Sequence, residues 1–408
     1  MVKSKGKIVA CLDIGTTKIA CSIAVVDDQE ITLLGYGYRE SKGVISGAIS
    51  DVRLAEKAIA NTVGDAEKMA GFNIDRLVVG LSNSQTVSQR KGVSTTIVSD
   101  MVKNSDITNL ASGIRYEYKK NNRELIHLIP LQYKIDNSTA VQNPRYMFGE
   151  LLSAKFHVIS TSFTTVKNIE NCLKRSQLSV HNYIVESYAS ALSALSENEM
   201  SLGSLVIDIG GGNTSFAVMV DGKLVHAGNF PIGGIHVTRD IATILNTDFE
   251  TAERIKTINN SLIINPLEEK ELIKIKSNDE RIGIVGVTKL ELKYIIESRI
   301  EEIINSVKTL LDKSGYGSYL VNNIVLTGGT SSIIGIEKVV NEIFKRQTRI
   351  GFPSKIKNLP SELDDPSFAN VLGMLVFLKN IYLKEKIKDG FEAKGSWFKR
   401  LVDYLVSL

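Results

Sequence analysis

The stretch LVIDIGGGNTSFAVMV, residues 205–220, decides the fold of this chain. An apolar run ends at Asp208, a glycine triplet follows, and Asn213 and Thr214 lead into a second apolar run. This pattern predicts two strands joined by a tight glycine turn. Glycine lets the backbone approach a ligand and turn N–H groups toward an anion, and a strand-end aspartate can hold the water shell of Mg²⁺. A purely structural hairpin would explain the same residues.

The same layout occurs near the N-terminus, in IVACLDIGTTKIACSIAVV, which begins at Ile8. Its apolar run ends in Asp13-Ile14-Gly15, and Thr16 and Thr17 precede the next apolar run. Aspartate aligns with aspartate, which indicates an internal duplication at a spacing of nearly half the chain. Two phosphate-type hairpins that face each other predict two similar domains that clamp one nucleotide.

A third glycine element, NIVLTGGTSSIIGI, is predicted as a strand from Ile324 that runs into Gly328-Gly329-Thr330. The three elements, in this order, resemble the actin/Hsp70/sugar-kinase ATPase superfamily. The resemblance implies a duplicated α/β actin-like fold. In that fold the first two hairpins hold the phosphates of ATP together with Mg²⁺, and the third element covers the adenosine.

The segment from about 85 to 162 breaks the duplication. It is predicted as a small α/β unit, with a helix around 105–117 and the strands ELIHLIPLQYKID and LSAKFHVIST. It resembles the extra subdomain of the FtsA family of bacterial cell-division proteins. The matching residues, in order, are Tyr133, Ile135, Asp136, Pro144, Met147, Gly149, Leu151, His157 and Val158. Singly, each is an ordinary turn or core residue, and their order carries the resemblance.

The resemblance to the FtsA family covers essentially the whole chain and implies a division into subdomains. These are 1A (1–84, 163–194 and the return helix 365–383), 1C (85–162), 2A (195–242 and 320–364), 2B (243–319), a flexible linker (384–395) and an amphipathic membrane-targeting helix (396–408). The short polar region 258–290 departs from the usual family pattern.

The superfamily resemblance also assigns roles at the nucleotide site. Donors to phosphate are Gly15, Thr16, Thr17 and Lys18 on one side, and Gly210, Gly211, Gly212, Asn213 and Thr214 on the other, with Gly233 and Gly234 nearby. Asp13 and Asp208 orient Mg²⁺ through water. Glu253 and Lys256 reach the ribose or base, under Gly328, Gly329 and Thr330. Glu186 matches the position that orients attacking water, although a helix N-terminal carboxylate stabilised by the macrodipole is an equal alternative. Turnover of ATP is therefore left open.

Composition limits the other possibilities. The chain has 408 residues and a net charge of +4 without a long Lys/Arg block, so nucleic acid is not indicated as a partner. The cysteines at 11, 21 and 172 lack metal-binding spacing and read as reduced core residues of a cytoplasmic protein. Lysines precede the first apolar run, but Asp13 and Lys18 interrupt that run, which argues against a signal peptide. No uninterrupted apolar stretch reaches the ~20 residues of a spanning helix.

The last residues, WFKRLVDYLVSL, form an amphipathic helix when placed at 100° per residue. Its apolar side carries Trp397, Phe398, Leu401, Val402, Leu405 and Leu408, while Lys399 and Arg400 can attract anionic lipid. Docking of this helix on its own protein is the alternative. The position after a glycine-containing tether favours a peripheral membrane anchor on the inner face of the cell membrane at the division site.

The FtsA resemblance further implies partners. These are the C-terminal tail of the tubulin-like ring protein FtsZ, other copies of the chain in filaments, and later division proteins. A long charged helix from about Lys289 to Asp312 is the candidate for the FtsZ tail, with Arg299 and Glu302 on its exposed side. A solvated helix face with i,i+3 pairing explains the same two residues.

Four other classes compete with this assignment. A sugar kinase needs a catalytic base and a sugar pocket, for which no segment is convincing. An Hsp70-type chaperone needs a peptide-binding domain that the length leaves no room for. Bacterial actins of the MreB or plasmid-segregation type lack the extra subdomain. A pilus-assembly protein resembling PilM shares the fold and the subdomain, and only the membrane helix argues against it.

Overall fold

Two five-stranded sheets form the centre of the computed structural model, which describes residues 6–278, 281, 283–316 and 321–389. The first sheet has the order β10-β6-β1-β2-β3, with β1 Lys7–Ile14, β2 Lys18–Val26, β3 Ile31–Glu40, β6 Arg76–Leu81 and β10 Ser179–Val185. The second has the order β13-β12-β11-β16-β17, with β11 Ser204–Ile209, β12 Thr214–Val220, β13 Lys223–Phe230, β16 Asn323–Thr327 and β17 Gln347–Ile350. A short ribbon, β4 Val44–Ile45 and β5 Ala48–Ile49, lies between β3 and the first helix.

The two sheets repeat one topology, which confirms the predicted duplication. In each, the first strand (β1 or β11) pairs antiparallel with the next strand and parallel with a later one (β6 or β16). The two aspartates hold equivalent register positions, because Asp13 pairs with Ala20 and Asp208 pairs with Ser215, one step before the turn. Both turns therefore open at the same edge of their sheets.

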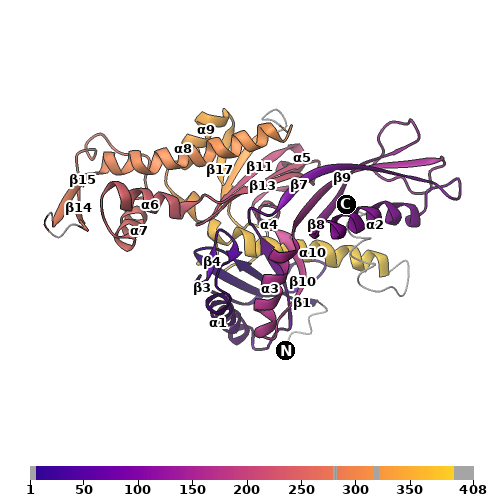
Figure 1. Cartoon of the computed structure of the whole chain (residues 1–408), viewed down its shortest axis with the longest axis horizontal. Coiled ribbons are helices and arrows are strands. Elements are labelled where there is room, and N and C mark those ends of the chain that lie inside the picture. Colours follow the sequence, from indigo (N-terminus) through magenta and orange to yellow (C-terminus); the bar gives the residue numbers. More distant parts are fainter. Residues whose placement is uncertain (1–5, 279–280, 282, 317–320, 390–408) are drawn as a thin grey trace.

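The helices cover these sheets (Figure 1). They are α1 Val52–Ala70, α2 Asn104–Lys120, α3 Phe163–Arg175, α4 Glu186–Ala194, α5 Glu197–Leu202, α6 Gly234–Ile244, α7 Phe249–Ile258, α8 Lys289–Lys313, α9 Ile336–Phe344 and α10 Ala369–Asp389, with the 3₁₀ turns η2 Gly329–Ser332 and η3 Pro366–Phe368. Helix α1 shows why such elements form where the sequence predicts them. Asp51 caps its first amides at 2.9 and 3.0 Å, and Gly71 ends it in the left-handed conformation, with φ of 80°.

Helices α4 and α10 cross between the halves of the molecule. Helix α4 continues from β10 of the first sheet and packs on β11 and β12 of the second, whereas α10 follows the second sheet and packs on β1 and β2 of the first. The helices approach so closely that a Cβ at Gly373 would overlap the backbone of Ala189. The small residues at this crossing are therefore a steric requirement of the two connections.

The inserted unit is a three-stranded antiparallel sheet in the order β7-β9-β8, with α2 packed against it. Its strands are β7 Val87–Thr96, β8 Arg123–Ile135 and β9 Leu151–Ser162. Some of the residues that carry the family resemblance stabilise a turn in this unit. Asp136 adopts a φ of 51°, and its carboxylate accepts from the amide of Leu151 at 2.8 Å. Gly149 lies against this turn, where a Cβ would come within 2.8 Å of the Asp136 carboxylate.

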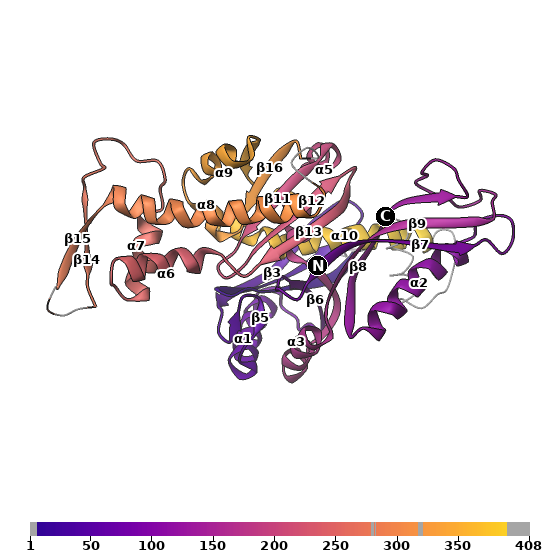
Figure 2. The ribbon, with the colours of Figure 1, turned by 45° about the horizontal axis from the view of Figure 1, so that its top comes forward.

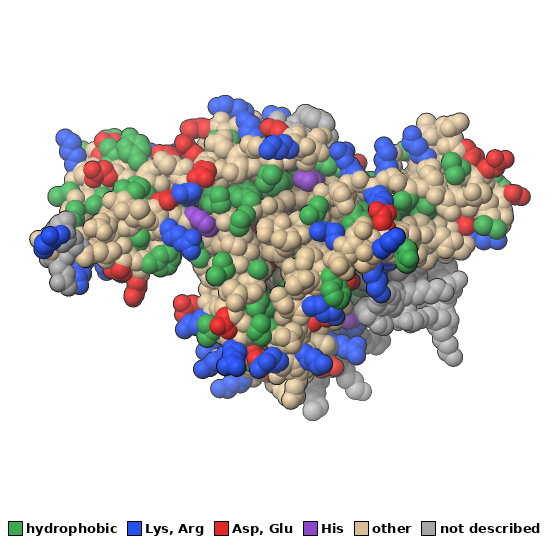
Figure 3. Space-filling model, in the orientation of Figure 1, with side chains coloured by type: hydrophobic (Ala, Val, Ile, Leu, Met, Phe, Trp, Pro, Cys, Tyr) green, Lys and Arg blue, Asp and Glu red, His purple; other side chains and the backbone are tan. Residues whose placement is uncertain are grey.

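The opposite end of the molecule carries α6, α7, the long helix α8 and the ribbon of β14 Leu272–Lys276 with β15 Ile284–Thr288 (Figure 2). The inserted unit and this ribbon lie at the two extremes of the long axis in both ribbon views. On the face seen in Figure 3, acidic and basic side chains are interspersed, with basic groups most frequent below, over α1 and α3.

Two details differ from expectation. Strand β7 is not anticipated, because its mostly polar sequence is exposed along much of its length and lacks an apolar alternation. Residues 384–389 belong to α10 rather than to a flexible tether, since Lys, Glu and Ile sustain a helix. Within the described residues, one helical stretch, 366–383, is apolar enough to cross a membrane, but 61% of it is buried inside the protein. The proposed membrane helix, 396–408, lies outside the described residues.

Candidate functional site

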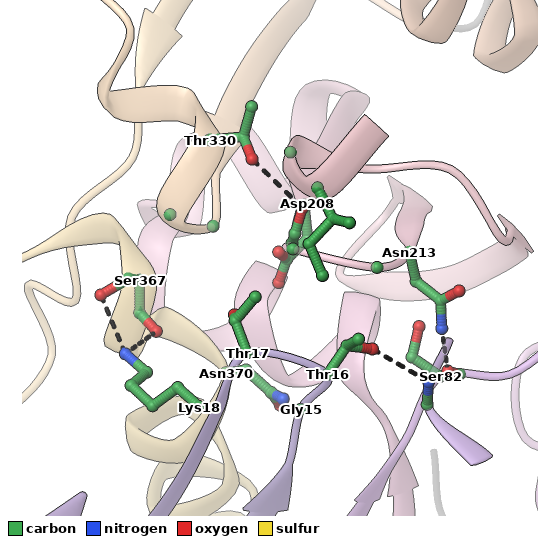
Figure 4. Close-up of a pocket in the computed structure, with 18 of the residues that line it drawn as sticks. Gly15, Thr16, Thr17, Lys18, Ser82, Asp208, Asn213, Thr330, Ser367 and Asn370 are labelled. Atoms are coloured by element: carbon green, nitrogen blue, oxygen red, sulfur yellow. Dashed lines mark hydrogen bonds between the residues drawn. The ribbon is translucent and has the colours of Figure 1, made fainter. Parts of the chain in front are cut away.

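A cleft of about 440 Å³ lies where the two hairpin turns meet (Figure 4). Most of the predicted nucleotide-site residues line it: Asp13, Gly15, Thr16, Thr17, Lys18, Glu186, Asp208, Gly210, Gly211, Gly212, Asn213, Gly234, Glu253, Lys256, Gly328, Gly329 and Thr330. The structure therefore brings residues more than 300 positions apart in sequence into one cleft that draws on both halves of the molecule.

The two turns interlock. A Cβ on Gly211 would come within 2.7 Å of the Thr17 hydroxyl, and one on Gly212 would come within 2.7 Å of the Thr16 Cβ. The Thr16 hydroxyl accepts from the amide of Gly47 at 3.2 Å, and the Asn213 amide donates to the carbonyl of Ser82. At these two positions the glycines make room for the threonines of the opposite turn, in addition to any approach by a ligand.

Three buried carboxylates, those of Asp13, Glu186 and Asp208, face this cleft from three elements. Burial raises the pKa of Asp13 to about 7; Lys18 opposes this shift, and Asp208 adds to it. Burial likewise raises the pKa of Asp208 and, together with both aspartates, raises that of Glu186 well above its usual range. The cleft thus concentrates negative charge that the protein compensates only in part, which favours binding of a cation.

The described residues hold no group of three or more His, Cys, Asp or Glu side chains arranged to bind a metal directly. A hydrated Mg²⁺ nevertheless fits the donor set, because Mg²⁺ keeps several waters and is held by one or two carboxylates together with substrate phosphates. The buried carboxamide oxygens of Asn213 and Asn370 line the same cleft and lack a hydrogen-bond partner within the described residues. They are available to a ligand or to water.

Lys18 turns toward the start of the return helix. Its ammonium donates to the carbonyl and hydroxyl of Ser367 at 2.8 and 2.9 Å and lies 3.3 Å from the ring centroid of Phe368. Burial lowers the pKa of Lys18 to about 8, although Asp13, Asp365 and Asp208 all favour its charged form. The cation therefore stands at the cleft and links the first hairpin to η3.

The third glycine element closes one side of the cleft. Gly328, with φ of 83°, lies against Asp208, and the Thr330 hydroxyl donates to the carbonyl of Gly210 at 3.1 Å. On the neighbouring helices, Lys256 donates to Glu253 at 2.8 Å and to the Thr238 hydroxyl at 2.8 Å. These groups form a polar wall beside the glycine turns.

Two predicted residues do not line the cleft. The Thr214 hydroxyl is buried and donates to the carbonyl of Ile232 at 2.8 Å, and Gly233 packs behind the carbonyls of Gly210 and Gly211. Both support the turn from behind. Conversely, sequence reasoning did not single out the cleft residues Gly47, Ser82, Ser215, Asn260, Ser367 and Asn370. Each is a single small or polar residue outside a glycine turn, so no local pattern marks it.

The predicted partner residues lie on α8, away from the cleft lining. The Arg299 guanidinium donates to both carboxylate oxygens of Asp240, at 2.6 and 2.7 Å, and to Glu302 at 2.5 Å. Arg299 is thus paired on the surface, and a partner would have to compete for it. The predicted lipid-binding residues lie outside the described residues.

Family models and sequence relatives match most of this chain. A family model described as "Cell division protein FtsA" matches residues 205–373, and one described as "SHS2 domain inserted in FTSA" matches residues 83–160. Relatives named cell division protein FtsA include one from Agrobacterium fabrum, 32% identical over 91% of this chain and 87% of its own length. Another, from Escherichia coli K12, is 30% identical over 98% of this chain and 97% of its own length.

Solved structures share the fold at lower identity. A PilM-PilN type IV pilus biogenesis complex aligns with a TM-score of 0.65 at 16% identity, over 91% of this chain and 98% of that chain. MreB5 of Spiroplasma citri bound to ADP aligns with a TM-score of 0.55 at 16% identity, over 95% of this chain and 99% of that chain. These similarities establish an actin-like fold. The pilus complex thus shares the fold at 16% identity, whereas the two relatives from Agrobacterium fabrum and Escherichia coli are both named cell division protein FtsA. This chain belongs to the FtsA family of actin-like cell division proteins.

Proposed function

We propose that this protein binds Mg-ATP between its two hairpins, polymerises on the inner face of the cytoplasmic membrane and anchors the FtsZ ring there. The observation that carries the nucleotide site is the cleft in which both glycine turns and three carboxylates converge. Family membership supports the role in division. MreB5, with the same fold, was solved bound to ADP and to AMPPNP.

The cleft residues divide the work of holding Mg-ATP. Backbone amides of both turns, with Thr16 and Thr17, would donate to phosphate, and Lys18 would exchange Ser367 for a phosphate oxygen. Asp13 and Asp208 would hold the water shell of Mg²⁺, which supplies positive charge to the phosphates. Glu253 and Lys256 would contact the ribose or base.

Binding of nucleotide is tested first. Asp208→Ala removes one carboxylate. We expect the affinity for Mg-ATP to fall by at least about tenfold, because a charged hydrogen-bonding group is lost. Equilibrium dialysis or a fluorescent ATP analogue measures the affinity. Parent-like affinity in Asp208→Ala would show that the nucleotide lies elsewhere.

Hydrolysis depends on Glu186, the first residue of α4, whose side chain lines the cleft. We propose that it orients attacking water. Glu186→Gln keeps the size and removes the ionisable carboxyl group, so a water-orienting role predicts slower phosphate release with ATP binding retained. A helix-start role predicts a lower melting temperature and unchanged release per bound ATP.

Membrane binding is proposed for the amphipathic helix that the sequence predicts at residues 396–408. Changing Trp397 and Leu401 to Glu interrupts its apolar side, so we expect the protein to leave anionic liposomes in co-sedimentation while ATP binding persists. Because one short helix is a modest anchor, filaments that present many of them should bind far more strongly. Retention of the Glu variant on liposomes would refute the anchor.

Binding of the FtsZ tail is proposed on α8 at Arg299 and Glu302. Arg299→Glu should weaken binding of an FtsZ tail peptide, but it also breaks the ion pair with Asp240. Asp240→Asn is the matched control, since it weakens that pair and leaves Arg299 in place. If both variants lose binding equally, Arg299 acts through the packing of α8 and does not contact the peptide. Later division proteins remain proposed partners without an assigned surface.

A further inference from the structure

The two cleft aspartates are held by side chains that lie on the crossing helices. The Ser190 hydroxyl of α4 donates to the Asp208 carboxylate at 2.6 Å, and Ser190 is fully buried. The Asn370 carboxamide, at the start of α10, is 6% exposed and lines the same cleft as Asp13, whose pKa its hydrogen-bonding group lowers. Figure 4 shows Asp208 and Asn370 in the cleft.

The origin of each helix makes this arrangement reciprocal. Helix α4 arrives from the first sheet yet packs on the sheet that carries Asp208, and α10 arrives from the second half yet packs on the sheet that carries Asp13. Each aspartate is therefore held by a segment that the opposite half of the molecule delivers. The crossing itself is tied by the Ser193 hydroxyl, which donates to the carbonyl of Ala369 at 2.6 Å.

We infer that Ser190 and Asn370 are positioning residues that orient Asp208 and Asp13 toward Mg²⁺, and that they couple this orientation to the relative position of the two halves. A carboxylate side chain can rotate, so its two oxygens have no fixed direction unless a neighbouring group holds one of them. A fixed donor on one oxygen leaves the other oriented. The inference rests on the proposed Mg-nucleotide site and deepens it.

The test separates metal-dependent from metal-independent binding. Affinity for the fluorescent N-methylanthraniloyl-ADP is measured with Mg²⁺ and again with EDTA. In the parent, Mg²⁺ should tighten binding. Ser190→Ala and Asn370→Ala should each reduce the ratio of the two dissociation constants by about tenfold, as expected for loss of a hydrogen bond to a charged group. Ser190→Cys, nearly the same size with a weaker donor, should fall between parent and Ser190→Ala.

Ser204→Ala is the matched control, because it removes a buried serine hydrogen bond from β11, the strand that carries Asp208, without touching a cleft carboxylate or the helix crossing. Its ratio should stay within about twofold of the parent. Melting temperatures without nucleotide show that each variant is folded, and Asn370→Ser replaces Asn370→Ala if the latter is not.

The outcomes are distinguishable. If the substitutions raise both dissociation constants equally or leave both unchanged, or if Ser204→Ala lowers the ratio as much, Ser190 and Asn370 are structural and the inference is wrong. If the parent binds no nucleotide in Mg²⁺, the proposed function itself fails, and the inference falls with it.

Discussion

The two hairpin turns share topology and register, but they present different chemistry to the cleft. The first turn offers side chains, namely Thr16, Thr17 and Lys18, whereas the second offers backbone at three successive glycines. The difference is complementary, since threonines on one side occupy the space that side chains on the other would need. A duplicated element has thus become asymmetric so that the two copies can close on one another.

The aspartates differ in the same way. Lys18 lowers the pKa of both carboxylates, but Asp13 has the carboxamide of Asn370 beside it, whereas Asp208 accepts from the hydroxyl of Ser190. The first half therefore supplies the cation, Lys18, and the second half supplies the glycine backbone of residues 210–212. Substitutions that erase one side of this asymmetry test whether both sides are needed.

The largest effect is expected from Gly211→Val. Its branched side chain would meet Thr17, so the turns cannot interlock and ATP binding should weaken on the order of 100-fold. Titration with a fluorescent ATP analogue measures the change. Partial recovery is expected for Gly211→Ala combined with Thr17→Ala, compared with Gly211→Ala alone, because the second change empties the contested space.

Gly64→Ala serves as the control, since open space surrounds Gly64 within α1. It should leave ATP binding unchanged and raise stability slightly, by up to about 1 kcal/mol. If the double variant binds ATP no better than Gly211→Ala alone, Gly211 is not needed to make room for Thr17.

An intermediate effect is expected from Asp13→Asn, which should change how the free energy of unfolding depends on pH. Burial raises the pKa of Asp13 from 3.8 to about 7, so the folded protein holds this proton more tightly than the unfolded chain. Asp13 therefore costs stability that develops as pH rises from about 4 to about 7 and is complete above that range. Without Mg²⁺ and nucleotide, the asparagine variant should gain stability over the parent across this window, on the order of 1–3 kcal/mol.

Chemical denaturation at several pH values measures this difference. A difference that stays flat from pH 5 to pH 8 would show that Asp13 has an ordinary pKa in the folded protein. Adding Mg-ADP should reverse the order at pH 8, because the ligand stabilises only a protein that can bind it.

The smallest effect is expected from Asn213→Ala, which removes the amide that joins the second turn to the Ser82 carbonyl in the first half. The loss should be about 1 kcal/mol in the free energy of unfolding, with a several-fold weaker affinity for ADP, since one hydrogen bond between the halves is lost. Thermal unfolding and ADP titration report the two quantities. An unchanged affinity would mean that this bond does not contribute to closure.

Much of the fold is legible in the sequence because local chemistry fixes it. The Asp208 turn, the cap at Asp51 and the stop at Gly71 each follow from a few adjacent residues. The duplication is legible because both copies keep the aspartate and the turn at the same register. The order of residues from Tyr133 to Val158 likewise predicts the inserted unit that the family comparison identifies.

The rest of the cleft was not predictable because it depends on how distant segments meet. Ser190, Ser367 and Asn370 reach the site only through the crossing of α4 and α10, which no single stretch encodes. The packing of Gly211 against Thr17 likewise depends on the placement of the two halves. Strand β7 forms by pairing with β9, although its own residues show little apolar alternation.

The central claim is that both hairpins hold one nucleotide at the same time. Hydrogen exchange with and without Mg-ATP tests it most directly, because backbone amides of residues 15–18 and 210–214 can be followed separately. We predict that one equivalent of Mg-ATP slows exchange in both turns together, and that Asp208→Ala abolishes the protection in both. Protection of only one turn, or of neither while ATP is bound, would contradict the account.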